Sequence, residues 1–234
     1  NIKYLAMIHH ETSTGQLNSL SQISDLCKQY NITFIVDSMS AFGAVDLDIY
    51  DMNIDFLISS SNKCLEGVPG FSYVICNKDK LKECIYSSSL CLDILDQYNN
   101  FELNGQFRFT PPTHTLLAFN YALNEYEKLG GLQARINKYK NNYMYLKSEM
   151  VKLGFRCFLN DEQQGYFITS FHYFDNEQFS FNDFYDYLKQ NGLIIYPGKT
   201  TKLPTFRIGN IGNITKDDIT NLLQKIKEYL DTIN

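Results

Sequence analysis

The chain has 234 residues, of which 44% are hydrophobic and 20% are charged, a composition typical of a globular protein. Its net charge is -5 and it contains no basic stretch, which argues against nucleic acid or an anionic membrane as a partner. No apolar run reaches the roughly 18 residues of a membrane-spanning helix, and no signal peptide is recognisable.

Strands and helices alternate in the first part of the chain. Residues 2–8 are expected to form a buried strand, and residues 19–30 have helical spacing, with Leu20, Ile23, Leu26 and Cys27 on one side. The apolar run 33–36 is typical of a parallel strand covered on both faces. Residues 55–59 and 71–76 predict two more strands. This rhythm favours an α/β layered domain.

The chain starts with a predicted core strand, whereas domain termini usually lie at the surface. We therefore expect further residues upstream of position 1. A complete protein from which a tag was removed is the alternative.

A long helical region and a compact unit make up the second part. One helix is predicted from Pro112 to about residue 129, and a second over 132–153, between Gly130-Gly131 and Gly154. The second helix carries Ile136, Tyr139, Tyr143, Leu146 and Met150 at helical spacing. Beyond it the pattern predicts strands near 155–159, 165–174, 193–196 and 205–209, and helices near 181–190 and 216–230. We expect one unit over 1–130, and a linking helix with a small α+β domain over 131–234.

Polar side chains follow three of the predicted strands. They begin at His9 after the first strand, at Asp37 after the second and at Ser59 after the third. The carboxyl ends of parallel strands are where ligands bind in α/β sheets. The three segments are therefore expected to form one site.

Asp37 and Lys63, an acid at one strand end and a lysine in a serine-rich turn, suit pyridoxal phosphate chemistry. A carboxylate keeps the ring nitrogen of that cofactor protonated, and a lysine amine forms a Schiff base with it and moves a proton. Thr12 and Asn62 could hold its phenolic oxygen or its phosphate. The alternatives are a solvated turn lysine and a strand-end or helix-capping aspartate.

Several segments resemble the fold-type I aminotransferases of the alanine–glyoxylate group, and within it the 2-aminoethylphosphonate–pyruvate transaminases. They are HHETSTGQLN at 9–18, VDSMSAFGA at 36–44, SSSNKCLEGVPGF at 59–71, FRFTPPTH at 107–114, IYPGK at 195–199 and FRIGNIG at 206–212. The resemblance covers nearly the whole chain. It implies that 1–130 is the C-terminal part of a cofactor-binding large domain, with a mixed and largely parallel sheet, and that 131–234 includes the small domain. It also implies a long N-terminal portion upstream.

The resemblance also implies a role for each site residue. Lys63 would form the Schiff base with pyridoxal phosphate, and Asp37 would pair with its pyridine nitrogen. Thr12 would lie near the phenolic oxygen and Asn62 near the phosphate. Thr110 would reach the phosphate of the neighbouring subunit's cofactor, so a homodimer is expected. Arg207 would bind the substrate carboxylate, which a guanidinium pairs bidentately.

Each of these roles has a structural alternative. Arg207 is also typical of a surface pair, Thr110 of an N-cap before Pro111-Pro112, and Thr12 and Asn62 of turn hydrogen bonds. No metal site is expected, because His9-His10-Glu11 lacks ligand spacing. Six cysteines without a C-x-x-C pair favour reduced thiols and a cytoplasmic location, and Cys64 is expected to be structural.

The function that follows is transamination from 2-aminoethylphosphonate to pyruvate, which yields phosphonoacetaldehyde and alanine. The alternatives are an alanine–glyoxylate or serine–pyruvate aminotransferase, and a truncated, non-catalytic protein of the same fold. A cysteine desulfurase is disfavoured, because that relative has His where this chain has Asn62.

Overall fold

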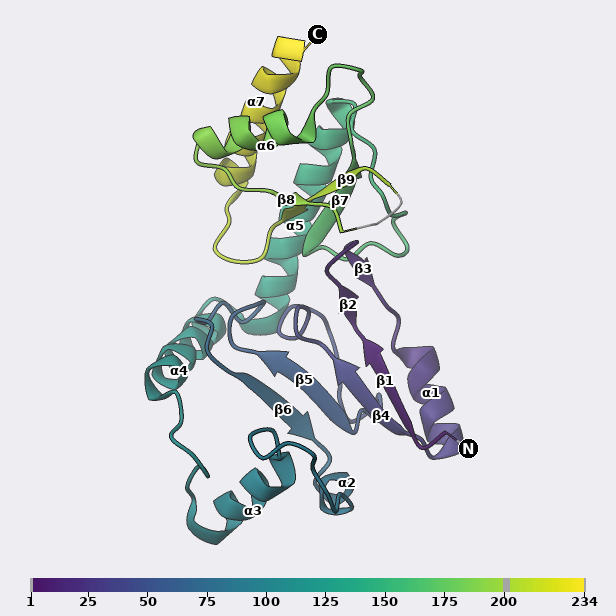
Figure 1. Ribbon diagram of the computed structural model, residues 1–234, viewed down its shortest axis with the longest axis vertical. Coiled ribbons are helices and arrows are strands. Elements are labelled where there is room, and N and C mark those ends of the chain that lie inside the picture. The colour runs from purple at the N-terminus through teal and green to yellow at the C-terminus, as the bar shows by residue number, and fades with distance from the viewer. Residues whose placement is uncertain (1, 200–202, 234) are drawn as a thin grey trace.

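Two sheets, one at each end of the long helix α5 (Gly131–Lys152), organise the fold in the computed structural model, which describes residues 2–199 and 203–233. The first sheet is built by residues before α5 and the second by residues after it (Figure 1). α5 begins after Gly130, whose backbone lies in the left-handed region with φ 99°, and it ends before Gly154. The predicted helix over 132–153 is confirmed.

The first sheet has the strand order β1-β4-β5-β6. Its strands are β1 (Tyr4–Ile8), β4 (Thr33–Asp37), β5 (Phe56–Ser60) and β6 (Ser72–Cys76). The first three are parallel and β6 is antiparallel to β5, so the sheet is mixed. All four predicted strands of this part are therefore confirmed, with bounds that differ by at most two residues.

Helix α1 (Ser21–Tyr30) covers one face of this sheet and contributes to its core. The buried side chains come from α1 and its start, from β4, and from β5 and the segment before it: Leu20, Cys27, Phe34, Val36, Ile54 and Leu57. The prediction that Leu26 shares the buried side of α1 is wrong, because its side chain is 48% exposed.

The predicted burial of the first two strands is also wrong. β1 lies at the edge of the sheet, and Ile2, Tyr4 and Ile8 are exposed. On β4 only Phe34 and Val36 are buried, whereas the alternate positions are half-buried. The reason is that α1 packs on one face only, whereas an apolar run does not reveal whether one or both faces of a strand are covered.

A short hairpin of β2 (His10–Glu11) and β3 (Gln16–Leu17) continues β1 and reaches the second sheet (Figure 1). At its turn Gly15 has φ 94°, and a Cβ added there would lie 2.2 Å from the carbonyl oxygen of Ile168. The Gly15 carbonyl accepts a hydrogen bond from the Gly165 amide at 2.8 Å. Only glycine allows this close approach of hairpin and sheet.

Three helices follow β6 at the side of the first sheet. α2 (Lys78–Lys82) and α3 (Ile94–Asn104) were not predicted, whereas α4 (Thr113–Lys128) matches the predicted helix over 112–129. The side chains of Asn77 and Asp93 cap α2 and α3 by accepting hydrogen bonds from backbone amides. Neither α3 nor α4 has a buried residue. None of the described helices is long and apolar enough to cross a membrane.

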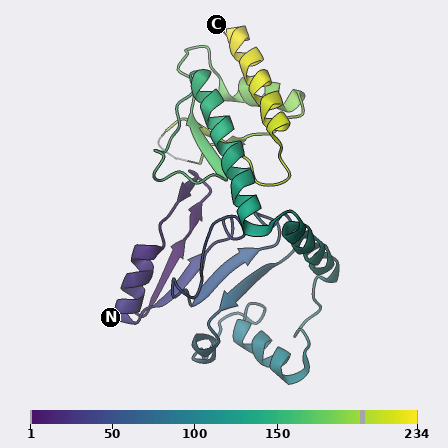
Figure 2. The ribbon, with the colours of Figure 1, turned by 180° about the vertical axis from the view of Figure 1, so that it is seen from behind.

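The second sheet is antiparallel, with the order β7-β9-β8. Its strands are β7 (Ile168–His172), β9 (Thr205–Gly209) and the two-residue β8 (Tyr196–Pro197). α5 and α7 (Lys216–Ile233) pack against each other on one face of it, which Figure 2 shows from the front, and α6 (Phe181–Gln190) packs on α7. A core rich in phenylalanine fills the space between, including Phe155, Phe171, Phe184 and Phe206.

The predictions for this part are largely confirmed. Helix α6 and strand β9 have the predicted bounds, and α7 extends three residues further. The strand predicted near 155–159 is wrong, because that segment makes only the single bridge Cys157↔Phe171 to β7. The strand predicted over 193–196 lies at 196–197 instead. Ile195 of this segment packs into the core without sheet pairing.

Candidate functional site

The carboxyl ends of three parallel strands meet at one edge of the first sheet, facing the second sheet (Figure 1). Ile8, Asp37 and Ile58 are in register across β1, β4 and β5. The pairing continues past the strands, since the His9 amide donates to the Asp37 carbonyl at 2.8 Å and the Ser38 amide to the Ile58 carbonyl at 2.9 Å. The expected meeting of the three polar segments at one edge is therefore confirmed.

Asp37 ends β4 with its side chain half-buried. Its Oδ1 accepts a hydrogen bond from the Met39 amide at 2.9 Å, which closes a turn at the strand end. Among the described residues no cation pairs with this carboxylate. One of its oxygens thus remains available to a positively charged ligand.

Lys63 lies in a tight turn that follows β5. The turn is closed by the Glu66 amide, which donates to the Lys63 carbonyl at 2.8 Å, and by the Gly67 amide, which donates to the Ser61 carbonyl at 2.8 Å. The Lys63 side chain is half-buried, and its amine has no hydrogen-bond or ion-pair partner among the described residues. The turn therefore leaves the Lys63 amine open to a ligand.

Asn62 precedes this lysine in the same turn. Its Oδ1 accepts a hydrogen bond from the Ser60 hydroxyl at 2.9 Å, as the turn alternative for Asn62 predicts. The oxygen is thereby oriented, while the amide nitrogen can still donate to an anion.

Two buried histidines join the strand ends to one another. Nδ1 of His9 lies 2.9 Å from the Ser38 hydroxyl, and Nδ1 of His10 lies 2.9 Å from the Ser40 hydroxyl. Burial lowers the pKa of each imidazole to about 4. Both rings are therefore neutral near pH 7, and they link the end of β1 to the end of β4 without adding charge to the site.

Arg207 of β9 reaches the hairpin from the second sheet. Its Nη1 donates to the Thr12 carbonyl at 2.7 Å, and its Nε donates to the Pro197 carbonyl at 3.0 Å. Burial lowers the pKa of the guanidinium from its usual value. The structure thus brings together two of the predicted residues, Thr12 and Arg207. Arg207 is buried and its hydrogen bonds to the described residues go to backbone carbonyls, which argues against the alternative of a surface ion pair.

Within the described part of the chain Thr110 makes no hydrogen bond to these residues, and it belongs to a different segment. It is exposed in the segment between α3 and α4, which runs along the β6 side of the sheet (Figure 1). Pro112, not Thr110, holds the N-cap position of α4, so the N-cap alternative is wrong.

Cys64, directly after the lysine, is fully buried. Its thiol donates to the Ser40 carbonyl at 3.3 Å, and burial raises the pKa of the thiol well above its ordinary value. The prediction that this cysteine is structural is therefore confirmed. All six cysteines are free.

A cluster around Glu66 was missed by the sequence analysis. The Glu66 carboxylate lies 2.7 Å from Nη1 of Arg135 and 3.3 Å from Nζ of Lys138, and it accepts a hydrogen bond from the Tyr139 hydroxyl at 2.7 Å. Arg135 also donates to the Cys64 carbonyl at 2.8 Å. The only available signal was the spacing of Arg135 and Tyr139 by one helical turn, and it does not identify the partner on another element.

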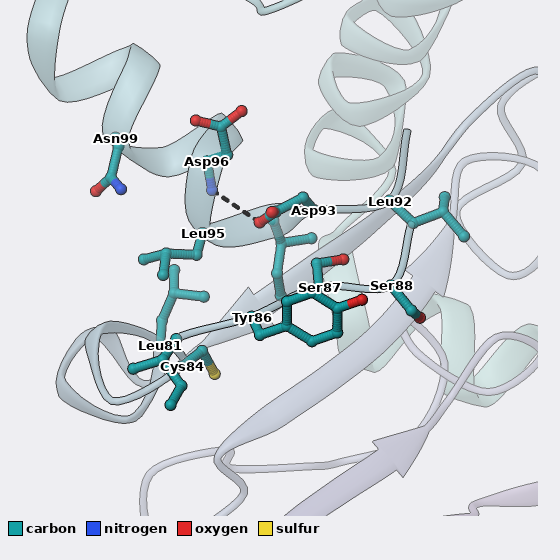
Figure 3. A pocket seen from close by; sticks show the side chains of 12 residues that line it. Leu81, Cys84, Tyr86, Ser87, Ser88, Leu92, Asp93, Leu95, Asp96 and Asn99 are labelled. Atoms are coloured by element: carbon teal, nitrogen blue, oxygen red, sulfur yellow. Dashed lines mark hydrogen bonds between the residues drawn. The ribbon is translucent and has the colours of Figure 1, made fainter. Parts of the chain in front are cut away.

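A surface cavity of about 560 Å³ lies away from Lys63, between α2, α3 and the segment that joins them. Figure 3 shows its lining, including the Asp93 carboxylate, which accepts a hydrogen bond from the Asp96 amide at 2.9 Å. This carboxylate serves as the cap of α3, and none of the predicted site residues lines the cavity. We therefore place the candidate site at the strand ends, where the reactive side chains converge.

Comparisons with known proteins point to one family. The model of the aminotransferase class-V family matches residues 1–217. A bifunctional phosphonoacetaldehyde hydrolase/aminoethylphosphonate transaminase of Clostridioides difficile (strain 630) is 45% identical over 233 residues, which are 99% of this chain and 37% of that protein. A 2-aminoethylphosphonate–pyruvate transaminase of Bacillus cytotoxicus is 47% identical over 229 residues, which are 97% of this chain and 62% of that protein.

A solved structure, the pyridoxamine-pyruvate aminotransferase of Mesorhizobium loti, superimposes with a TM-score of 0.88 at 20% identity. The match covers 99% of this chain and 60% of that one, and it confirms the expected fold of the fold-type I aminotransferases. The chain thus spans less than two thirds of the length of these relatives.

Proposed function

The chain belongs to the aminotransferase class-V family, and from this premise we propose that it carries the lysine-bearing part of a pyridoxal-phosphate-dependent aminotransferase. The observation that carries the proposal is the pair of Lys63 and Asp37 at neighbouring strand ends, where the amine and one carboxylate oxygen have no partner among the described residues. In this proposal residues 1–130 form the C-terminal part of the cofactor-binding large domain. Residues 131–234 form the linking helix and the small domain.

The residues at the strand ends fit pyridoxal phosphate by their chemistry. A carbonyl carbon needs a free amine, a protonated pyridine nitrogen needs a carboxylate, and a phosphate needs amide and hydroxyl donors. Lys63 and Asp37 meet the first two needs. The amide nitrogen of Asn62 supplies a donor of the third kind, because only its Oδ1 is engaged within the turn.

When bound, the cofactor supplies an electron sink for the carbon that loses its proton. The Lys63 amine would hold the cofactor carbon, leave it when an amine substrate arrives, and carry the proton between the two carbon atoms that exchange it. Asp37 would keep the ring nitrogen protonated through its free oxygen. Thr12 would lie beside the phenolic oxygen and Asn62 beside the phosphate.

Arg207 is the proposed partner of the substrate carboxylate. Two of its donors are occupied by carbonyls of Thr12 and Pro197, so the guanidinium is held in one orientation. A guanidinium fixed in this way keeps further N–H donors for a carboxylate. Because Arg207 extends from β9 to the hairpin of β2 and β3, a substrate carboxylate bound to it would lie between the two sheets.

The proposed reaction transfers the amino group of 2-aminoethylphosphonate to pyruvate, yielding phosphonoacetaldehyde and alanine. The names of the two relatives at 45% and 47% identity support this choice of donor. Alanine and phosphonoacetaldehyde formation, measured with 2-aminoethylphosphonate, alanine or serine as donor and pyruvate or glyoxylate as acceptor, would separate this activity from its relatives.

We also propose a homodimer in which Thr110 faces the partner's cofactor. The segment around Thr110 is rich in exposed apolar side chains, and Leu103 and Leu117 are 81% and 70% exposed. Such a surface favours a protein partner. Sedimentation of the chain with and without pyridoxal phosphate would test it, and a monomer under both conditions would contradict it.

The role of Lys63 is tested by trapping. The chain is incubated with pyridoxal phosphate and reduced with borohydride, and the modified peptide is identified by mass. We expect the label on Lys63 together with a visible absorbance band, and the loss of both in Lys63→Ala. Lys147→Ala is the matched control, because Lys147 has a similarly half-buried side chain on α5. Equal labelling of other lysines, or a band that survives in Lys63→Ala, would refute the proposal.

A further inference from the structure

The turn that carries Lys63 contains a strained residue. Glu66 has φ 56°, in the left-handed region that side chains other than glycine rarely adopt. Such a conformation persists only when its surroundings hold it. The Glu66 side chain is only 19% exposed, and side chains of α5 bind it.

Arg135 of α5 holds the turn at two points. Its Nη1 lies 2.7 Å from the Glu66 carboxylate, and the same atom donates to the Cys64 carbonyl at 2.8 Å. One contact is to the residue directly after Lys63 and the other is to the residue that closes the turn. Arg135 is itself buried, and its guanidinium lies over the rings of Tyr126 and Tyr139. The cation therefore has little freedom to move away.

Tyr139 extends the same contacts to the second sheet. Its hydroxyl donates to Glu66 and accepts a hydrogen bond from the Gly212 amide at 3.1 Å. Nδ2 of Asn210 donates to the Tyr139 carbonyl at 3.2 Å. Gly212 and Asn210 follow β9, the strand of Arg207. One cluster thus contacts both the lysine turn and the loop that follows the arginine strand.

We propose that Glu66, Arg135 and Tyr139 are positioning residues that set the Lys63 amine relative to β9 and Arg207. The inference rests on the proposed role of Lys63 as the cofactor-binding lysine. The three residues act through backbone that they hold, and none of them is expected to touch the reacting atoms. A single carboxylate is the junction, because both Arg135 and Tyr139 bind Glu66.

Amide hydrogen exchange of the cofactor-free, full chain tests the coupling. Tyr139→Phe keeps the ring and removes the hydroxyl, and Glu66→Gln keeps the shape and removes the charge. We expect each to speed exchange about tenfold or more in peptides covering both 61–68 and 209–214, as the loss of a hydrogen bond to a charged group predicts. Lys147→Gln, which removes the ion pair of α5 with Asp161, is the control and should alter neither peptide.

A second measurement detects the position of the amine. Arg135→Lys keeps the charge, but an ammonium lacks the planar fork of the guanidinium and is not expected to hold both the carboxylate and the Cys64 carbonyl. With pyridoxal phosphate bound, we expect a change in the visible circular dichroism of the cofactor in Arg135→Lys and in Glu66→Gln. The control Lys147→Gln should keep the wild-type dichroism.

Two results would overturn the inference. The first is faster exchange in only one of the two peptides, and the second is wild-type dichroism in folded Arg135→Lys and Glu66→Gln. Failure of the proposed function is distinguishable, because the wild-type chain would then form no band with Lys63. The exchange experiment would still decide whether the cluster couples the turn to the loop.

Discussion

Protonation of His9 and His10 should destabilise the chain as the pH falls. Both rings are buried, and each has its Nδ1 bonded to a serine hydroxyl. Nε2 of His10 is also buried and has no hydrogen-bond partner among the described residues, with the Phe167 ring centroid 4.9 Å from its own. An imidazolium at either position would lose its hydration, and at His10 the attraction of the Glu11 carboxylate offsets only part of this cost.

The size of the effect follows from the pKa values. Burial lowers the pKa of both imidazoles from 6.5 to about 4. This difference of about 2.5 pH units, at about 1.4 kcal/mol per unit, corresponds to about 3.5 kcal/mol for each ring. Together the two approach the whole stability of an ordinary domain, about 5–15 kcal/mol.

The sign is fixed by which state binds more protons. Above pH 6.5 both states hold neutral rings and the two histidines cost nothing. Between pH 6.5 and about 4 the unfolded chain binds more protons, so the free energy of unfolding falls as the pH falls. Below about 4 the loss is complete.

Urea unfolding at several pH values measures this loss. From about pH 7 to about pH 5 each histidine should remove about 2 kcal/mol, so His9→Gln and His10→Gln should each flatten the pH dependence by that amount. His114→Gln is the control, because His114 is exposed on α4. A wild-type free energy that does not change across this range, or an unchanged slope in both buried variants, would refute the reasoning.

Two further predictions concern close packing. Gly15→Ala should lower the free energy of unfolding by about 2 to 5 kcal/mol, because a left-handed backbone and a Cβ only 2.2 Å from a carbonyl oxygen of β7 both cost energy. Gly105→Ala, with φ 70° and nothing within 4 Å, should lose only the backbone part of about 1 to 2 kcal/mol, and equal losses in urea unfolding would contradict the clash. Alkylation followed by mass spectrometry should label the exposed Cys84 and Cys91 quickly and leave buried Cys64 unlabelled in the folded chain; early labelling of Cys64 would show that its thiol is accessible.

The strand ends of the site could be predicted from the sequence because the relevant signals are local. The apolar run 33–36 and the acid that follows it identify both β4 and Asp37. The lysine turn follows β5 in the same way. Local alternation does not, however, report which faces of a strand are covered. Tyr4 is 67% exposed because β1 lies at the edge of the sheet, although its segment is as apolar as a buried strand.

Contacts across long sequence separations account for most of what was missed. Glu66 and Tyr139 are 73 positions apart, and no periodicity links them. The hairpin at Gly15 depends on β7, which is far along the chain. Helix α3 was missed although Ile94, Tyr98 and Phe101 recur at helical spacing, and none of its residues is buried.

The length of α5 has a geometric consequence for the two sheets. Tyr139 lies in the core between the sheets, while Leu146 and Met150 lie in the core of the second sheet. An α-helix turns by about 100° and rises about 1.5 Å with each residue. One residue more or less between Tyr139 and Leu146 would swing the second sheet to another side of the helix, and only changes by whole turns would keep Arg207 facing the hairpin. The number of residues in α5 thus fixes the rotation, about the helix axis, of the Arg207 side of the site relative to the Lys63 side.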